Sequence, residues 1–191
     1  MSDPVPADIP VADTPRTDAD CVGAPEPGDP LPPLTGAARI VIASTRASDG
    51  TYEDRTGPIL HEWLVGRGLA VPPQSVVPDG PEVGRAIGHA LEEGVDIVIT
   101  SGGTGITPSD ATPEQTAPFL DRELPGILEE IRRRGIAKQP AALLTRGKAG
   151  LAGKTLVVNL PGSRGGVKDG IAVLDPVLAH LLAQRRGEGH R

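Results

Sequence analysis

The 191-residue sequence allows one ordinary globular domain with some chain left over. It carries 25 acidic and 19 basic residues and only three aromatic ones, so neither net basicity nor a base-stacking surface indicates a nucleic acid or an anionic membrane as partner. No apolar run approaches the roughly 20 residues that cross a bilayer, and the single cysteine, Cys21, excludes a disulfide framework, so we expect a cytoplasmic protein.

The first 37 residues differ in composition from the rest. They hold nine of the 21 prolines and seven acids against one base, Arg16, while the remaining chain has 18 acids and 18 bases. A segment of this kind cannot bury enough apolar surface to offset its chain entropy. We therefore predict a disordered acidic tail over residues 1–37 and one folded domain over residues 38–187.

From residue 38 onward, strand patterns alternate with helix patterns. The β-branched run at 38–44 predicts a buried strand, and apolar residues at helical spacing predict a helix over 57–69. Further strands are predicted at 75–79, 95–100 and 154–162, and further helices at 81–94, at 113–135 with proline breaks at Pro118 and Pro125, and at 165–186. The alternation predicts an α/β fold, a three-layer arrangement of a mostly parallel sheet with helices on both faces.

Ligands of such folds bind beyond the carboxyl ends of the strands, where loops meet helices. That rule selects the four segments that follow predicted strands, three of which are rich in glycine and hydroxyl side chains: 45–57, 78–80, 101–113 and 160–166. Their convergence at one edge of the sheet predicts the binding site.

The glycine loop, residues 101–113, has the sequence SGGTGITPSDATP. It has neither the lysine of a P-loop nor the third glycine of a dinucleotide fingerprint, whose place is taken by Pro108. Thr112 is expected to be the N-cap of a helix whose first residue is Pro113. The positive end of that helix would then lie just after Asp110, in a loop suited to anions.

A carboxylate beside an anion site is understandable if a divalent cation lies between them. Magnesium is commonly held by one or two carboxylates together with substrate phosphates. Asp79, at the end of the neighbouring strand, would supply a second acid to the cleft that contains Asp110. The alternative is that each aspartate only forms a turn by accepting hydrogen bonds from its own backbone.

The motifs together resemble the Mog/MoaB family of molybdenum cofactor biosynthesis, which includes the molybdopterin adenylyltransferases and the G domain of gephyrin. The resemblance covers residues 38–185 in order and is carried by the segments 43–60, 76–80, 100–116, 124–132, 144–163 and 165–170. One departure follows the first strand, where the family often has Ser-Asp-Arg and this chain has Ser44, Thr45 and Arg46.

This resemblance implies Mg²⁺-dependent adenylylation of molybdopterin by ATP with release of pyrophosphate. It also implies a homotrimer and a partner protein for molybdenum insertion. Asp79 and Asp110 match the aspartates that the family needs for metal-assisted transfer. The residues that match its substrate-binding and nucleotide-binding loops are Gly102, Gly103, Thr104, Gly105, Asn159, Pro161, Gly162 and Ser163.

Three further residues are added from the chemistry. Arg46 and Lys168 are candidate cations for the phosphates, although each is also an ordinary surface charge, and Thr112 marks the helix start beside them. The attacking phosphate of molybdopterin is already ionised at neutral pH, so the reaction requires no general base and depends on positioning and charge neutralisation.

Two other functions compete with the adenylyltransferase. One is a non-catalytic molybdopterin-binding or scaffold protein of the same pathway, which the presence of both Asp79 and Asp110 disfavours. The other is nucleotide hydrolysis by a domain related to competence-damage proteins, which the short single-domain chain disfavours.

Overall fold

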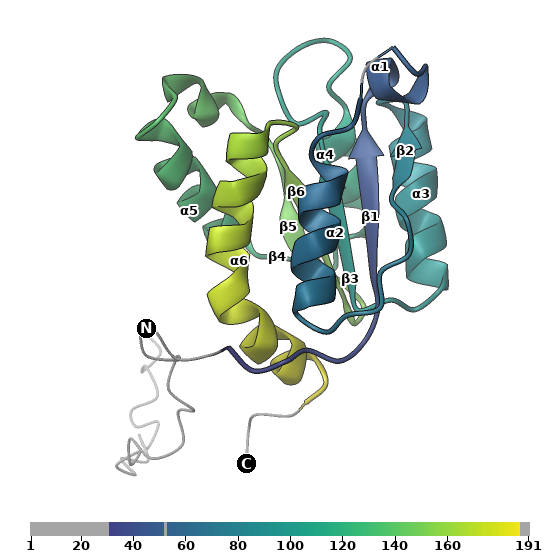
Figure 1. Cartoon of the computed structure of the whole chain (residues 1–191), viewed down its shortest axis with the longest axis vertical. Coiled ribbons are helices and arrows are strands. Elements are labelled where there is room, and N and C mark those ends of the chain that lie inside the picture. The colour runs from purple at the N-terminus through teal and green to yellow at the C-terminus, as the bar shows by residue number, and fades with distance from the viewer. Residues whose placement is uncertain (1–30, 52, 188–191) are drawn as a thin grey trace, which may run out of the picture.

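A computed structural model describes residues 31–51 and 53–187 (Figure 1). Its centre is a six-stranded sheet in the order β2-β1-β3-β6-β5-β4. The strands are β1 (Ala38–Ala43), β2 (Ser75–Val77), β3 (Ile97–Ser101), β4 (Arg122–Glu123), β5 (Ala149–Ala152) and β6 (Thr155–Leu160). The predicted strands at 38–44, 75–79, 95–100 and 154–162 are thereby confirmed.

Four of the strands run parallel. β1 pairs with β2 and with β3, and β3 pairs with β6, all in parallel register. β5 turns back antiparallel along β6, and β4 pairs antiparallel with β5. The carboxyl ends of the parallel strands therefore share one edge, which Figure 1 shows at the top, beside α1 and a long teal loop.

Helices connect the parallel strands. They are α1 (Thr45–Ser48), α2 (Gly57–Gly66), α3 (Pro81–Glu92), α4 (Thr112–Thr116), α5 (Pro125–Ile136) and α6 (Arg164–Arg185), with the 3₁₀ turns η2 (Ala117–Phe119) and η3 (Pro140–Leu144). Within the described residues, none of these helices has the length and apolarity needed to cross a membrane.

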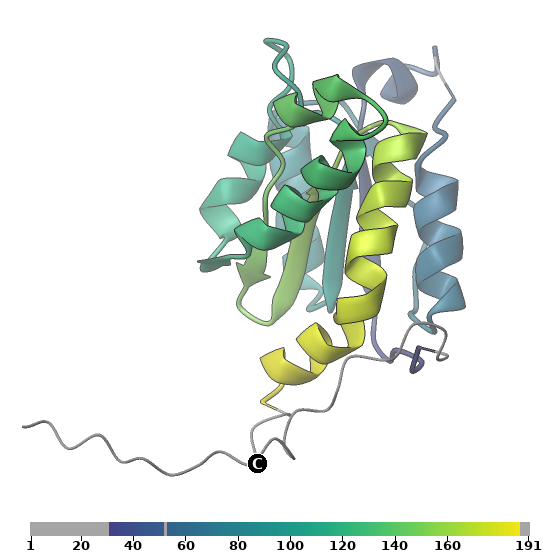
Figure 2. The same ribbon diagram turned by 90° about the vertical axis from the view of Figure 1, so that its left-hand side faces the viewer.

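The side chains of each strand alternate between two cores. Ile40 and Ile42 of β1 belong to the core that also contains buried leucines of α2, α5 and α6. Val41 and Ala43 face the opposite way and pack with Val83 and the rest of the buried face of α3. In Figure 2, α2 (blue) and α6 (yellow) stand on the same side of the strands. The predicted three-layer arrangement is confirmed.

The segment predicted as helical over 113–135, with breaks at Pro118 and Pro125, is divided near both prolines. α4 and η2 come first, the chain then extends into β4, and α5 begins at Pro125. Pro125 suits the first helical position because its missing N–H would have no partner there. The two-residue strand β4, which was not predicted, extends the sheet beyond β5.

The structure moves the start of the folded domain ahead of residue 38. The Leu34 side chain is 5% exposed and belongs to the core shared with α2. Its N–H donates to the Arg67 carbonyl at 2.7 Å, and the Ala70 N–H donates to the Gly36 carbonyl at 2.9 Å. Residues 34–37 were therefore wrongly assigned to the tail. Residues 1–30 of that predicted tail lie outside the described residues.

Candidate functional site

A cleft of about 750 Å³ opens at the edge where the parallel strands end. Three of the four predicted loops contribute several residues each, and the fourth contributes Asp79. The lining is Ile42, Ala43, Ser44, Thr45, Arg46, Ala47, Asp54, Arg55, Thr56, Asp79, Ser101, Gly102, Gly103, Thr107, Ser109, Asp110, Gly162, Ser163 and Arg164. The predicted location of the site at this edge agrees with the structure.

Backbone forms the floor of the cleft. Gly102 has a φ of +104°, and a Cβ on it would lie less than 3.0 Å from the Ala43 carbonyl oxygen at the end of β1. Gly162, after β6, makes a looser but still tight approach, since its Cβ would lie 3.0 Å from the Gly102 Cα. Three strand ends therefore touch through their main chains, and the approach requires glycine at both positions.

Gly103 is the contact point between the glycine loop and Asp79. Its φ is +60°, and a Cβ there would lie less than 3.0 Å from both the Asp79 Oδ2 and the Thr112 Oγ1. The Asp79 Oδ1 accepts a hydrogen bond of 3.3 Å from the Ala111 N–H. The Asp79 carboxylate is thus enclosed by the glycine loop, although β1 lies between β2 and β3 in the sheet.

This enclosure changes the acidity of Asp79. Burial raises the pKa of its carboxyl above the ordinary aspartate range, and the nearby charge of Asp110 acts in the same direction. Hydrogen bonds from the Ala111 and Gly80 backbone, and the nearby Thr112 hydroxyl, oppose the rise in pKa. Because the charged form of this carboxylate is unfavourable, a cation bound beside it would stabilise that form.

Asp110 has a role in shaping its own loop. Its Oδ2 accepts hydrogen bonds from the Thr107 N–H at 2.8 Å and from the Thr107 hydroxyl at 2.6 Å. The turn-forming alternative is therefore correct for one oxygen of Asp110. The residue nevertheless lines the same cleft as Asp79, so turn formation and a cleft-facing charge coexist in one side chain.

Thr112 differs from its predicted role. The N-cap of α4 is Ala111, Thr112 is already helical, and no side chain caps the helix. The Thr112 N–H instead donates to the Gly103 carbonyl at 3.1 Å, and the helix begins one residue earlier in the chain than predicted. The Thr112 hydroxyl is buried and has no hydrogen bond of normal geometry among the described residues, although it lies close enough to Asp79 to affect its pKa.

Asn159 does not reach the cleft. It is completely buried in β6, where its amide donates to the Thr100 and Thr116 hydroxyls at 3.0 and 2.9 Å. Its Oδ1 accepts from the Lys148 N–H at 3.0 Å. These three bonds occupy the side chain in joining β6 to its neighbours, so its assignment as a binding residue is corrected to a structural one.

The other predicted binding residues divide into two groups. Those that line the cleft are Arg46, Gly102, Gly103, Gly162 and Ser163; those that do not are Thr104, Gly105, Pro161 and the exposed Lys168. Thr104 is buried and accepts a hydrogen bond of 3.0 Å from the Thr145 hydroxyl, so it supports the loop from behind. Ser163 is the N-cap of α6, and its hydroxyl accepts from the Gly166 N–H at 3.0 Å.

Sequence reasoning missed two cations of the lining, Arg55 and Arg164. Both lie in loops that the strand-end rule had selected, and that rule was the available signal for them. Arg55 sits next to Asp54, whose Oδ1 accepts from the N–H groups of Thr56 and Gly57 at the start of α2. Asp54 thus fixes the backbone that carries Arg55.

The cleft therefore combines three aspartates (Asp54, Asp79 and Asp110), a main-chain floor, and arginines from separate loops. In the parts of the chain that the structure describes, no group of three or more His, Cys, Asp or Glu could hold a metal. A cation bound by Asp79 and Asp110 would need further oxygen ligands from substrate and water, as is usual for magnesium. These features define an α/β domain with a cleft suited to anionic ligands at the strand ends.

Residues 39–180 match the protein family described as a probable molybdopterin binding domain, and the chain belongs to that family. The resemblance to the Mog/MoaB proteins is thereby confirmed.

Two relatives illustrate the match. A molybdopterin adenylyltransferase of Pyrococcus furiosus is 35% identical over 159 residues, covering 81% of this chain and 94% of the relative. A molybdenum cofactor biosynthesis bifunctional protein of Chlorobaculum tepidum is 39% identical, covering 79% of this chain and 49% of the relative. The chain thus spans about half the length of the bifunctional relatives.

The fold is also similar to solved structures. The molybdopterin biosynthesis Mog protein from Mycobacterium ulcerans superposes with a TM-score of 0.75 at 53% sequence identity, covering 78% of this chain and 98% of that one.

Proposed function

We propose that this protein transfers the adenylyl group of ATP to molybdopterin. The terminal phosphate oxygen of molybdopterin would attack the α-phosphorus of ATP, a new phosphorus–oxygen bond would form, and the bond to the β-phosphate would break to release pyrophosphate. The names of the relatives support a role in molybdenum cofactor biosynthesis. The observation that carries the proposal is the pair Asp79 and Asp110 on the wall of a cleft whose floor is main chain.

The donor set around Gly103 fits a magnesium ion. Asp79 and Asp110 would hold it, and the buried Thr112 hydroxyl, which lacks a hydrogen bond of normal geometry, is a further oxygen beside Asp79. Magnesium prefers oxygen ligands of this kind. When bound, it would neutralise charge on the ATP phosphates and lower the barrier to their displacement.

The remaining residues of the cleft would bind and orient the two anions. Arg46, Arg55 and Arg164 approach from two different loops and are suited to phosphate oxygens because guanidinium groups offer paired donors. The N-terminus of α6, with Ser163 as its cap, adds the positive end of a long helix. Catalysis would consist of bringing both substrates into line, since the attacking phosphate needs no general base.

The test is pyrophosphate release from ATP, Mg²⁺ and molybdopterin, together with detection of adenylyl-molybdopterin. In Asp110→Asn the amide oxygen can still accept from Thr107, so the turn survives while the charge is lost. We expect the rate to fall by about 100-fold or more. Asp121→Asn is the matched control, because Asp121 also accepts from a backbone amide but does not line the cleft.

A binding-only member of the pathway is the second candidate. It is favoured by the two hydrogen bonds that Asp110 makes to Thr107, which would preserve this residue for its turn alone. Tight molybdopterin binding without pyrophosphate release would establish it and reject the adenylyltransferase, whereas full pyrophosphate release in Asp110→Asn would reject the catalytic role of Asp110. We also propose a homotrimer, which light scattering on the purified protein would test.

A further inference from the structure

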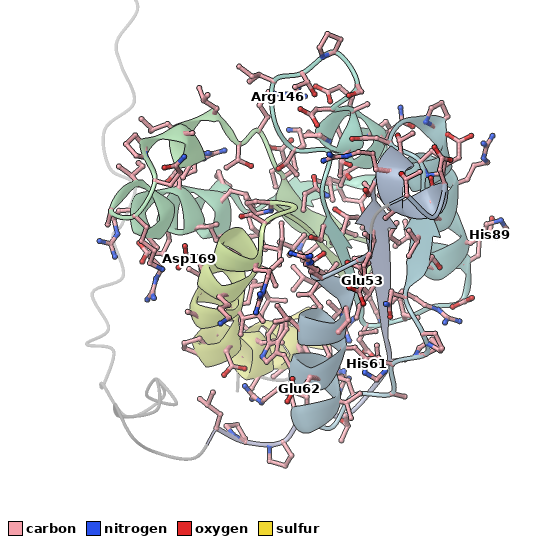
Figure 3. All side chains as sticks on the ribbon, turned by 45° about the horizontal axis from the view of Figure 1, so that its top comes forward. Glu53, His61, Glu62, His89, Arg146 and Asp169 are labelled. Carbon is pink, nitrogen blue, oxygen red and sulfur yellow. The ribbon has the colours of Figure 1, made fainter. Side chains whose placement is uncertain are left out.

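Arg146 contacts the glycine loop from outside the cleft. It lies between η3 and β5, and its N–H donates to the Thr104 carbonyl at 2.8 Å. Figure 3 labels Arg146 near the long loop at the top of the molecule. The side chain is 37% exposed and is absent from the cleft lining, so it is not placed to touch a ligand in the cleft.

The guanidinium joins the two ends of the segment 105–110. Its Nε donates to the Gly105 carbonyl at 2.6 Å, and its Nη2 donates to the Asp110 carbonyl at 2.7 Å. The planar guanidinium therefore sets the distance between the main chain at Gly105 and the main chain at Asp110.

The third contact ties this segment to the following helix. Arg146 Nη1 forms an ion pair with Glu114 of α4, and this hydrogen bond lowers the pKa of the Glu114 carboxyl. Because the three partners need three differently directed N–H groups, a planar guanidinium satisfies them together and an ammonium group does not.

Little else restrains the outer part of the segment. Residues 106–109 are all exposed, and Ile106 is 64% exposed despite its apolar side chain. Within the segment, Asp110 Oδ2 closes a turn onto Thr107. That turn fixes Asp110 relative to Thr107. The position of both residues relative to Asp79 depends on contacts outside the turn, which are those of Arg146 and the Ala111 N–H bond to Asp79.

From these contacts we propose that Arg146 is a positioning residue that sets the Asp110 carboxylate relative to Asp79. The inference rests on the proposed function, since the value of that placement is to let both carboxylates serve one cation. Arg146 acts through Asp110 and not by contact with substrate, and this distinction gives a specific kinetic signature.

The kinetic test uses Arg146→Lys, which keeps the positive charge. We expect kcat to fall by about 10- to 100-fold, as for a misplaced catalytic group, with the KM for ATP within about twofold of the parent. In an Asp110→Asn background the same substitution should cause almost no further loss of kcat, because the Asp110 charge that Arg146 positions is already absent. Equal losses of kcat in the two backgrounds would overturn the proposal.

Two companion variants sharpen this test. Glu114→Gln weakens the ion pair but leaves both carbonyl contacts of Arg146, so it should reduce kcat less than Arg146→Lys does. Arg133→Lys is the matched control, because Arg133 is an exposed arginine that pairs with Glu130 on α5 in the same way. It should leave kcat unchanged, and a loss equal to that of Arg146→Lys would contradict the inference.

Hydrogen exchange tests the positioning without any enzymatic readout. The Thr107 and Asp110 amides are hydrogen-bonded inside the segment, and Arg146→Lys should speed their exchange by about tenfold while the Gly57 amide of α2 keeps its rate. Unchanged exchange at Thr107 and Asp110 would overturn the inference. If the parent releases no pyrophosphate, the adenylyltransferase proposal fails, and exchange still decides whether Arg146 holds the segment.

Discussion

Asp79 and Asp110 face one cleft although the strands that carry them are not adjacent in the sheet. β1 lies between β2 and β3, and the two loops meet across its end, where the Ala111 N–H donates to Asp79 Oδ1. The Asp110 charge is close enough to raise the pKa of Asp79. The site thus keeps two like charges together at a cost in free energy that a bound cation, or protonation of Asp79, would remove.

The first prediction concerns the free-energy cost of keeping Asp79 charged beside Asp110. Burial and Asp110 raise the pKa of Asp79, so folding favours its protonated form and the charged form destabilises the domain at neutral pH. Asp79→Asn should therefore raise the melting temperature at pH 7 by about 1–4 °C in the metal-free protein while abolishing pyrophosphate release.

The pH dependence fixes the sign of this effect. As the pH falls through the raised pKa of Asp79 toward the ordinary aspartate value of about 3.9, the parent takes up a proton and its disadvantage disappears. Thermal melts of both proteins between pH 7 and pH 4 should converge at the acidic end. Asp49→Asn, at an exposed position of the same edge, is the control; a lower melting temperature for Asp79→Asn at pH 7 would contradict the account.

The second prediction compares two glycines with the same backbone conformation. Gly103 has a φ of +60° and Gly153 a φ of +59°, but a Cβ on Gly103 would collide with Asp79 and Thr112 whereas one on Gly153 would meet nothing within 4 Å. Both alanine variants should lose about 1–2 kcal/mol from the left-handed conformation. Only Gly103→Ala should also lower the rate of pyrophosphate release, by about 100-fold. Equal activities would show that the crowding at Gly103 is unimportant.

The third prediction separates structure from binding at Asn159. Asn159→Ala leaves the Thr100 and Thr116 hydroxyls and the Lys148 amide without their partner, so the free energy of unfolding should fall by about 2–4 kcal/mol. Urea denaturation measures this loss, and the folded variant should keep its KM for ATP. Lys168→Ala, at an exposed position, should change neither quantity. A stable Asn159→Ala protein with a raised KM would restore the binding role.

The fourth prediction concerns the start of the domain. Leu34→Ala removes a buried side chain and should cost about 2–4 kcal/mol of stability, whereas Leu143→Ala, at a 61% exposed leucine, should cost almost nothing. A chain that begins at residue 31 should melt at the temperature of the full chain, and one that begins at residue 38 should melt lower. Identical melting of the two truncated chains would place the boundary at residue 38 after all.

The sequence patterns predicted the fold best where burial imposes a pattern. β1, β3 and β6 are almost entirely buried and rich in β-branched and other apolar residues, so they could be identified without a structure. β4 consists of two exposed charged residues and forms by pairing with β5, so no local sequence pattern predicts it. Leu34 was missed for a similar reason, since one leucine among prolines gives no periodicity.

The candidate site was predictable to the extent that topology dictates it. Parallel strands bring their following loops to one edge, and this rule placed Asp79 and Asp110 together. A polar residue in a buried strand is ambiguous, because it can face a ligand or bond its neighbours, and Asn159 does the latter. Arg146 escaped notice because two of its side-chain partners are main-chain carbonyls, which every residue possesses.

The glycine contacts of the floor also limit how the domain can move. Gly102 meets the Ala43 carbonyl and Gly162 meets Gly102 with no space for a methyl group, so the ends of β1, β3 and β6 shift together or not at all. Any rearrangement that admits two large anions and releases pyrophosphate would therefore take place in the described part of the rim, in residues 45–51, 53–56 and 105–110. Turnover would then be limited by how fast these surface segments open, while the main-chain floor of the cleft keeps its position.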